Sequence, residues 1–317
     1  MCFLSVHAME SPAVRLPAST ESSAAVLDLI HLKELMERTR GSADVKIGLI
    51  DGPVAANHPD LPSSNIREIP SKLPGSCARA GSAACTHGTL VAGILLAKRG
   101  SGAPGIAPDC TLLVRPIFGD SPSQNSGIPS ATPEELAAAI IDAVDAGARV
   151  LNLSAAIFRG DPKGEQRLSE ALDHTARRGT LVVAAAGNQA MLGSSAITRH
   201  PWVIPVVACG AGGRLSDISN LGSSIGRQGL SAPGENIVSL AAGGKLQAFS
   251  GTSAAAPFVT GAIALLCSEF PNASAPEVKL AITGNGRHPR RTLVPPLLNA
   301  WAAYQTLAFV GSGRNVS

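Results

Sequence analysis

The sequence Gly-Thr-Ser-Ala-Ala-Ala-Pro at residues 251–257 continues as Phe-Val-Thr-Gly-Ala-Ile-Ala-Leu-Leu-Cys to residue 267. This stretch is almost entirely small or apolar, and a helix that is apolar all round is a buried one. Pro257 is tolerated near the start of such a helix, where backbone N–H groups have no intrahelical acceptor. We therefore predict a helix through the core, with Ser253 at its N-terminus on a turn set by Gly251. Serine at a helix start is often only an N-cap, and residue type alone leaves that role open for Ser253.

The composition is that of a chain with a large core. Of 317 residues, 45% are hydrophobic and 15% are charged, against about 25% charged in ordinary soluble domains. The net charge of +3 gives no reason to expect a nucleic-acid partner. We see no uncharged apolar run of about 18 residues, so we also expect no membrane association. Residues 1–13 lack the basic region that precedes the apolar part of a secretory signal.

The six cysteines are scattered and contain no Cys-x-x-Cys pair. Reduced thiols in a cytoplasmic protein are therefore the default expectation. Cys77 and Cys85 are close enough in sequence to form a bridge, or to join His87 in a metal site, and the sequence leaves these alternatives open.

Short apolar runs that alternate with helical segments dominate the chain from residue 27 onward. This alternation predicts an α/β fold with a mainly parallel sheet and helices on both faces. No linker interrupts it, so we expect one domain over residues 27–310, a flexible N-terminal arm at 1–26 and a C-terminal tail at 311–317. The expected strands are 45–50, 112–117, 149–154, 180–186, 203–208 and 237–240, and the expected helices are 27–40, 86–97, 132–146, 164–178, 253–267 and 296–307.

Four polar residues are predicted at strand ends or in first helical turns, where an active site of an open α/β sheet forms. They are Asp51, His87, Asn188 and Ser253. Singly they are ordinary, since Asp51 precedes a Gly-Pro turn and His87 could be an exposed or capping residue. Together they supply a serine nucleophile, an imidazole to take its proton, a carboxylate to orient the imidazole and an amide for the developing oxyanion.

The blocks that hold these residues resemble the catalytic blocks of subtilisin-like (S8) serine proteases, in the chain order Asp, His, Ser. The resemblance covers nearly the whole chain and implies a three-layer subtilisin-like fold. The matching blocks are 45–52 (Val-Lys-Ile-Gly-Leu-Ile-Asp-Gly), 86–93 (Thr-His-Gly-Thr-Leu-Val-Ala-Gly), 150–154 (Val-Leu-Asn-Leu-Ser), 183–188 (Val-Ala-Ala-Ala-Gly-Asn) and 251–257.

The resemblance implies a role for each matched residue. Ser253 would attack the scissile carbonyl, and its backbone N–H would be a second oxyanion donor beside the Asn188 amide. His87 would be the general base and then the general acid, and Asp51 would orient it. A peptide would lie between a wall at Ser154, Ala155 and Ala156 and a facing strand at 113–118, pairing with both by β-augmentation. The substrate-binding residues are thus expected to be Ser154, Ala155, Ala156, Phe118 and Gly187. We expect no cofactor and no metal, since no Asp-rich calcium loop is evident.

Two departures from the family pattern bear on the substrate. Asp51-Gly52-Pro53 stands where most members have Asp-Thr-Gly, and it is more like the proteases of cyanobactin-type pathways, which cut the leader from a precursor peptide. Ala155-Ala156 replaces the usual Leu-Gly of the substrate wall. We predict a cytoplasmic serine endopeptidase acting on a peptide or precursor peptide. The alternatives are a transpeptidase or macrocyclase with the same triad, and an inactive peptide-binding scaffold.

Overall fold

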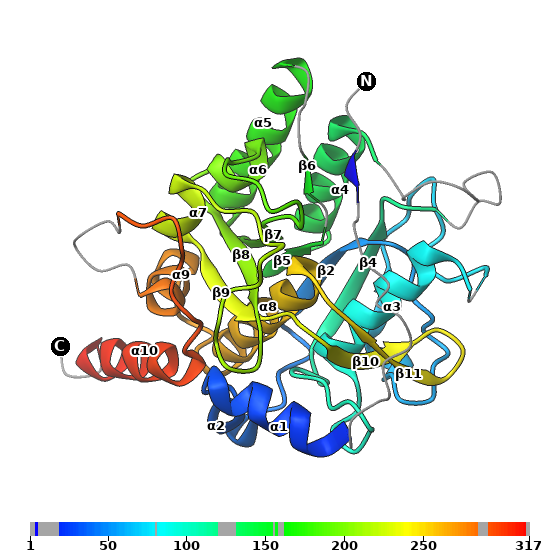
Figure 1. The fold of residues 1–317 in the computed structure, drawn as a ribbon, viewed down its shortest axis with the longest axis horizontal. Helices are drawn as coiled ribbons and strands as arrows, with labels where there is room; N and C mark the ends of the chain where they lie inside the picture. Colours follow the sequence, from blue (N-terminus) through cyan, green and yellow to red (C-terminus); the bar gives the residue numbers. More distant parts are fainter. Residues whose placement is uncertain are drawn as a thin grey trace.

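Seven parallel strands form the central sheet of the protein, as a computed structural model shows (Figure 1). The structure describes residues 4–5, 19–79, 81–119, 131–154, 156–157, 162–284 and 291–314. The strand order is β3-β4-β2-β5-β7-β8-β9. These strands are β2 (Lys46–Asp51), β3 (Ile66–Glu68), β4 (Thr111–Pro116), β5 (Val150–Leu153), β7 (Leu181–Ala185), β8 (Val203–Cys209) and β9 (Leu230–Pro233).

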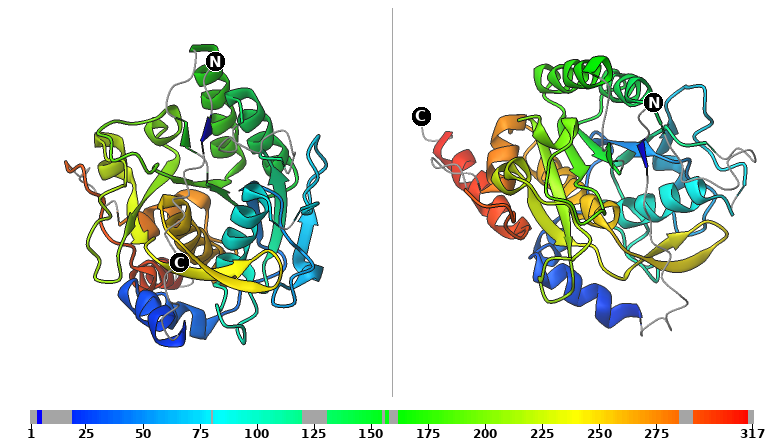
Figure 2. Two further views of the ribbon diagram at one scale, coloured as in Figure 1. Left: turned by 45° about the vertical axis from the view of Figure 1, so that its right-hand side comes forward. Right: turned by 45° about the horizontal axis from the view of Figure 1, so that its top comes forward.

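Helices cover both faces of this sheet, which confirms the predicted three-layer α/β fold (Figure 2). Helices α4 (Pro133–Asp145) and α5 (Pro162–Arg178) pack on one face. Helices α3 (Ala83–Leu96) and α8 (Thr252–Glu269) pack on the other. Helix α4 starts at the predicted place because Thr132 caps it in a capping box with Glu135, and Pro133 is its first residue.

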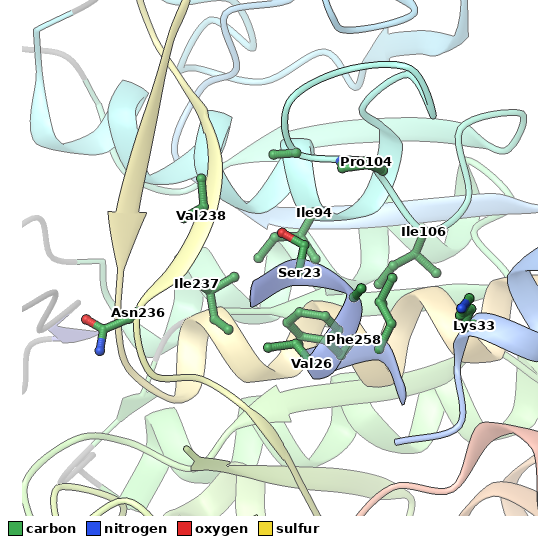
Figure 3. A pocket seen from close by; sticks show the side chains of 13 residues that line it. Ser23, Val26, Lys33, Ile94, Pro104, Ile106, Asn236, Ile237, Val238 and Phe258 are labelled. Carbon is green, nitrogen blue, oxygen red and sulfur yellow. The ribbon is translucent and has the colours of Figure 1, made fainter. Parts of the chain in front are cut away.

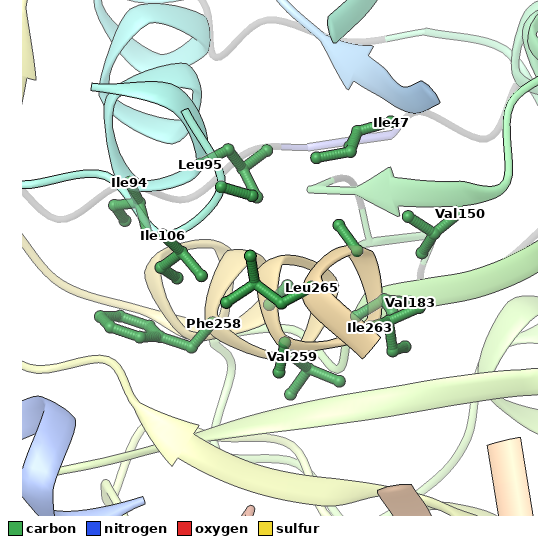
Figure 4. Close-up of a cluster of buried hydrophobic side chains, with 14 of the residues drawn as sticks. Ile47, Ile94, Leu95, Ile106, Val150, Val183, Phe258, Val259, Ile263 and Leu265 are labelled. Carbon is green, nitrogen blue, oxygen red and sulfur yellow. The ribbon is translucent and has the colours of Figure 1, made fainter. Parts of the chain in front are cut away.

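Alternate residues of each buried strand supply two separate hydrophobic layers, since successive side chains of a strand point to opposite faces. Ile47 and Leu49 of β2 belong to the layer that surrounds α8, whereas Ile50 belongs to the layer under α4. Figure 4 shows side chains of α8 packed between α3 and strands β2, β5 and β7. Among the described helices, α8 alone is long and apolar enough to span a membrane, but 89% of it is buried inside the protein. It is the core helix that residues 251–267 predict.

The remaining elements lie around the sheet. A hairpin of β10 (Ile237–Ala241) and β11 (Lys245–Phe249) packs against α3, and β1 (Leu4–Ser5) pairs antiparallel with β6 (Ala156–Ile157). The other helices are α1 (Ser19–Leu29), α2 (Lys33–Arg38), α6 (Ala196–Arg199), α7 (Ser223–Gln228), α9 (Ala275–Thr283) and α10 (Ala300–Arg314), with a 3-10 turn, η1, at Ser63–Asn65.

Several expected boundaries are wrong. The helix expected at 27–40 is two helices, α1 and α2, because the chain turns at His31 with φ of 48°. Residues 4–5 and 19–26 of the expected N-terminal arm lie in β1 and α1, and α10 extends beyond residue 310. The division into arm, domain and tail stays a prediction. The strand expected at 237–240 exists as β10, but it belongs to the hairpin and not to the parallel sheet.

Candidate active site

Ser253 is the second residue of α8, and it lies at the edge of the core as predicted. The cap position is Gly251, whose φ of 133° is a conformation that disfavours any other residue. The Ser253 hydroxyl is buried and makes no hydrogen bond, so the alternative that it caps the helix is wrong. Pro257 lies inside the helix and lacks the N–H that would otherwise bond to the Ser253 carbonyl.

Asp51 and His87 form a direct hydrogen bond, with Nδ1 of His87 2.7 Å from Oδ1 of Asp51. Both side chains are buried, with exposures of 0% for Asp51 and 6% for His87. His87 is the fifth residue of α3, because the helix begins at Ala83 behind the capping Ser82, so His87 is neither an exposed residue nor the cap. A carboxylate only accepts hydrogen bonds, so Nδ1 carries the proton and Nε2 of the neutral ring is a bare acceptor.

Two glycines allow the close approach that this bond needs. A Cβ on Gly52 would lie 2.1 Å from the carbonyl oxygen of Ala84, and a Cβ on Gly88 would lie 2.5 Å from that of Pro53. Helix α3 therefore rests directly on the Asp51-Gly52-Pro53 turn. Glycine at position 52 is accordingly a packing requirement of this turn.

The two reacting atoms expected to meet in catalysis, Nε2 of His87 and Oγ of Ser253, are both buried and without a hydrogen-bond partner. No hydrogen bond joins them in this structure. The end of strand β11, shortly before α8, nonetheless reaches the imidazole, because the ring of Phe249 meets the ring of His87 edge-on with centroids 6.2 Å apart. In free enzymes such catalytic bonds are often long and tighten only when substrate binds.

Asn188 lies beside the start of α8. The backbone N–H of Thr252 donates to Oδ1 of Asn188 over 2.8 Å, and the N–H of Gly187 donates to the Thr252 hydroxyl over 3.1 Å. The acceptor end of the Asn188 amide is thus held at Thr252, the residue before Ser253. The predicted oxyanion role would use the other end of the amide, Nδ2.

The predicted substrate wall is held by a chain of side-chain hydrogen bonds that the sequence did not reveal. Thr260 of α8 donates to Oδ1 of Asn152 over 2.8 Å, and Nδ2 of Asn152 donates to the Ser154 hydroxyl over 2.8 Å. Asn152 and Thr260 are completely buried. The sequence feature that could have pointed to these bonds is a polar residue, Asn152 or Thr260, inside each of two otherwise apolar runs.

The structure places the other predicted substrate-binding residues in different surroundings. Gly187 is buried beside Thr252, and Ala156 lies in β6 with its backbone paired to Ser5. Ala155 lies outside the described residues. Phe118 is 2% exposed and packs in the hydrophobic layer under α4, and its predicted contact with substrate stays a prediction.

Cys77 and Cys85 form a disulfide, so the default of reduced thiols is wrong for this pair. Because both sulfur atoms are bonded to each other, the alternative metal site with His87 lacks its thiolate ligands. Cys110, Cys209 and Cys267 are free and buried, and burial raises the pKa of the Cys110 and Cys209 thiols to about 11.

An apolar pocket of about 290 Å³ lies between α1, α3, α8 and β10 (Figure 3). Ile94 of α3 and Phe258 of α8 contribute to its lining, but none of the predicted site residues does. The pocket is therefore separate from the candidate active site.

Known proteins resemble this chain over most of its length. A model of the subtilase family matches residues 42–291. Subtilisin amylosacchariticus of Bacillus subtilis subsp. amylosacchariticus is 32% identical over 241 residues, which are 75% of this chain and 59% of that protein. Subtilisin DY of Bacillus licheniformis is 31% identical over 262 residues, 80% of this chain and 87% of that protein. The chain thus spans less than two thirds of the length of several subtilisins that it matches.

Solved structures give the same answer. The protease domain of PatA superposes with a TM-score of 0.75 at 32% identity, covering 85% of this chain and 97% of that one. The prenylagaramide maturation protease PagA superposes with a TM-score of 0.74 at 30% identity, covering 87% and 98%. The PatG macrocyclase has a TM-score of 0.74 but only 21% identity, so it shows the shared fold alone. The chain belongs to the subtilase family.

Proposed function

We propose that this protein is a serine endopeptidase that hydrolyses peptide bonds through Ser253, His87 and Asp51. One observation carries the proposal. The Asp51–His87 bond fixes the imidazole with Nε2 unprotonated, while that nitrogen and the Ser253 hydroxyl are both buried and unpaired. Leaving a buried polar atom without a hydrogen bond costs about 1–3 kcal/mol, and a catalytic role is one reason why a protein keeps such an atom.

The geometry supports an acyl-enzyme mechanism. Oγ of Ser253 attacks the carbonyl carbon while Nε2 of His87 takes the hydroxyl proton, and Asp51 stabilises the imidazolium. The carbonyl oxygen becomes an oxyanion, which accepts hydrogen bonds from Nδ2 of Asn188 and the backbone N–H of Ser253. The intermediate expels the amine, which receives the proton from His87. Water then attacks the ester with His87 again as the base, and Ser253 is released.

The substrate we propose is an extended peptide, specifically a precursor peptide from which a leader is cut. Support for the extended form comes from β6, which accepts an antiparallel partner strand in β1 (Figure 1). Support for the precursor comes from the similarity to PatA and PagA, which are both maturation proteases, and from Asp51-Gly52-Pro53. The cytoplasmic location remains a prediction, and the Cys77–Cys85 disulfide argues against it, because disulfides are rare in cytosolic proteins.

Mass spectrometry of a peptide library incubated with the purified protein tests this proposal. Wild type is expected to give linear fragments, and His87→Ala none. His174→Ala is the matched control, because His174 also pairs with a carboxylate, that of Asp145, but lies on α5. Cyclic or ligated products would instead favour the transpeptidase alternative. An absence of any turnover by wild type would leave the inactive scaffold as the better account.

A further inference from the structure

The loop that carries Asn188 is irregular and strained. Gly187 has φ of 104° and Ala190 has φ of 51°, so left-handed residues stand on both sides of Asn188. A left-handed conformation is costly for alanine, about 1–2 kcal/mol. Such a conformation persists only where the surroundings fix it. The loop therefore depends on contacts from outside itself.

Asn220 supplies five of these contacts, beside those that Thr252 and Ile218 make to the loop. Its Oδ1 accepts hydrogen bonds from the backbone N–H groups of Gln189 and Met191, both over 3.1 Å. Its Nδ2 donates to the carbonyl of Ala186 over 3.1 Å and to Oε1 of Gln189 over 2.8 Å. Its own backbone N–H donates to the carbonyl of Gly187 over 2.9 Å. These bonds reach residues on both sides of Asn188.

Asn220 is itself rigidly placed. It is 7% exposed, and a Cβ on Gly187 would lie only 2.2 Å from its Nδ2, so a side chain at position 187 would displace it. The preceding residue, Ser219, accepts a hydrogen bond from the N–H of Ala208 in the core strand β8 over 3.0 Å. The sheet thus holds Asn220, and Asn220 holds the loop.

From this geometry we infer that Asn220 is a positioning residue for the oxyanion site, acting through Asn188. The inference rests on the proposed function. In the described part of the chain Asn220 makes no hydrogen bond to Ser253 or His87, so its effect reaches the reaction by fixing where the Asn188 amide lies. A hydrogen-bond donor that is misplaced by a fraction of an ångström stabilises the transition state less than it should, while substrate binding changes little.

A double-mutant cycle tests the inference. Asn220→Ala is expected to lower kcat about 10- to 100-fold with little change in KM, a smaller loss than the 10²–10³ for removal of an oxyanion amide. In an Asn188→Ala background, Asn220→Ala is expected to cause no further loss. Asn220→Asp keeps the acceptor for Gln189 and Met191 but not the donor, and is expected to lose less than Asn220→Ala.

Gln228→Ala is the matched control. Gln228 is also a buried amide that donates to backbone carbonyls, those of Thr198 and His200, but it does not touch the Asn188 loop. Its loss should lower the thermal stability without lowering kcat. Equal kcat losses in Asn220→Ala and Gln228→Ala, or independent losses in the cycle, would overturn the inference. If folded wild type has no turnover at all, the proposed function fails instead.

Discussion

The backbone N–H of Thr252 donates a hydrogen bond to Oδ1 of Asn188 over 2.8 Å. The residue that precedes the proposed nucleophile therefore sets the orientation of the proposed oxyanion donor. Helix α8 begins at Thr252, and the partial positive charge of a helix N-terminus also favours an anion there. This short contact links the helix that carries the proposed nucleophile directly to the proposed oxyanion donor.

Replacing Asn188 by Ala removes the side-chain donor but leaves Ser253 and His87 in place. We expect kcat to fall about 10²–10³-fold with little change in KM, the size known for the corresponding amide in subtilisin. Steady-state kinetics on a peptide substrate measure this. A rise in KM with unchanged kcat would show that Asn188 binds the ground state and does not stabilise the oxyanion.

The buried chain from Thr260 through Asn152 to Ser154 should affect substrate binding and not the chemistry. Thr260→Val keeps the shape of the side chain but removes its hydroxyl. Loss of one buried hydrogen bond is worth about 1 kcal/mol, so KM for an extended peptide should rise about fivefold. Thr260→Ser keeps the hydroxyl, so its KM should equal that of wild type.

Thr175→Val is the control for this experiment, since Thr175 is equally buried and its hydroxyl donates within α5 to the Leu172 carbonyl. It should lower stability without changing KM. If both valine variants change KM alike, Thr260 has a merely structural role.

The strand β1 occupies an edge that a substrate peptide is proposed to use, because Leu4 and Ser5 pair with Ile157 and Ala156. Removing residues 1–5 should lower KM for an extended peptide several-fold by ending this competition, with kcat unchanged. Removing only residues 1–3 keeps β1 and serves as the control. Identical KM values for the two truncated proteins would show that β1 and substrate do not compete.

The Cys77–Cys85 disulfide closes a loop with a sequence separation of 8 residues that ends in the first turn of α3. The chain-entropy model assigns such a bridge about 2.5 kcal/mol of stability. Chemical denaturation with and without dithiothreitol should show this decrease in wild type. The Cys77→Ser, Cys85→Ser double variant should have a lower free energy of unfolding than wild type without reductant. Its free energy of unfolding should not change when dithiothreitol is added. A response of the double variant equal to that of wild type would assign the effect to other cysteines.

Much of the site could be predicted because its residues stand where regular elements end. Strand β2 ends at Asp51, and α8 begins just before Ser253, each after a run of apolar residues that only a buried element explains. Helix α3 begins three residues earlier than expected, because Ser82 caps it and Ala83 to Cys85 form its first turn. His87 consequently lies in the second turn of α3 and not in the first turn, as the sequence predicted.

Other features depend on contacts between distant residues, which no local sequence pattern predicts. Residues 237–241 have the composition of a core strand, and only their pairing with β11 places them outside the parallel sheet. The chain breaks between α1 and α2 because His31 has a left-handed conformation. A histidine in the sequence does not predict that conformation. Asn220 sits in a Gly/Ser-rich stretch, and its importance appears only when the loop of Asn188 folds around it.

The central claim is that Ser253 is a nucleophile activated by His87, and covalent labelling tests it most directly. Intact-mass measurement after treatment with a fluorophosphonate should show one adduct on wild type, none on Ser253→Ala and much slower labelling of His87→Ala. Ser239→Ala is the control, because Ser239 is buried and donates to the Leu90 carbonyl of α3. It should be labelled like wild type. Equal labelling of Ser253→Ala and wild type would contradict the account.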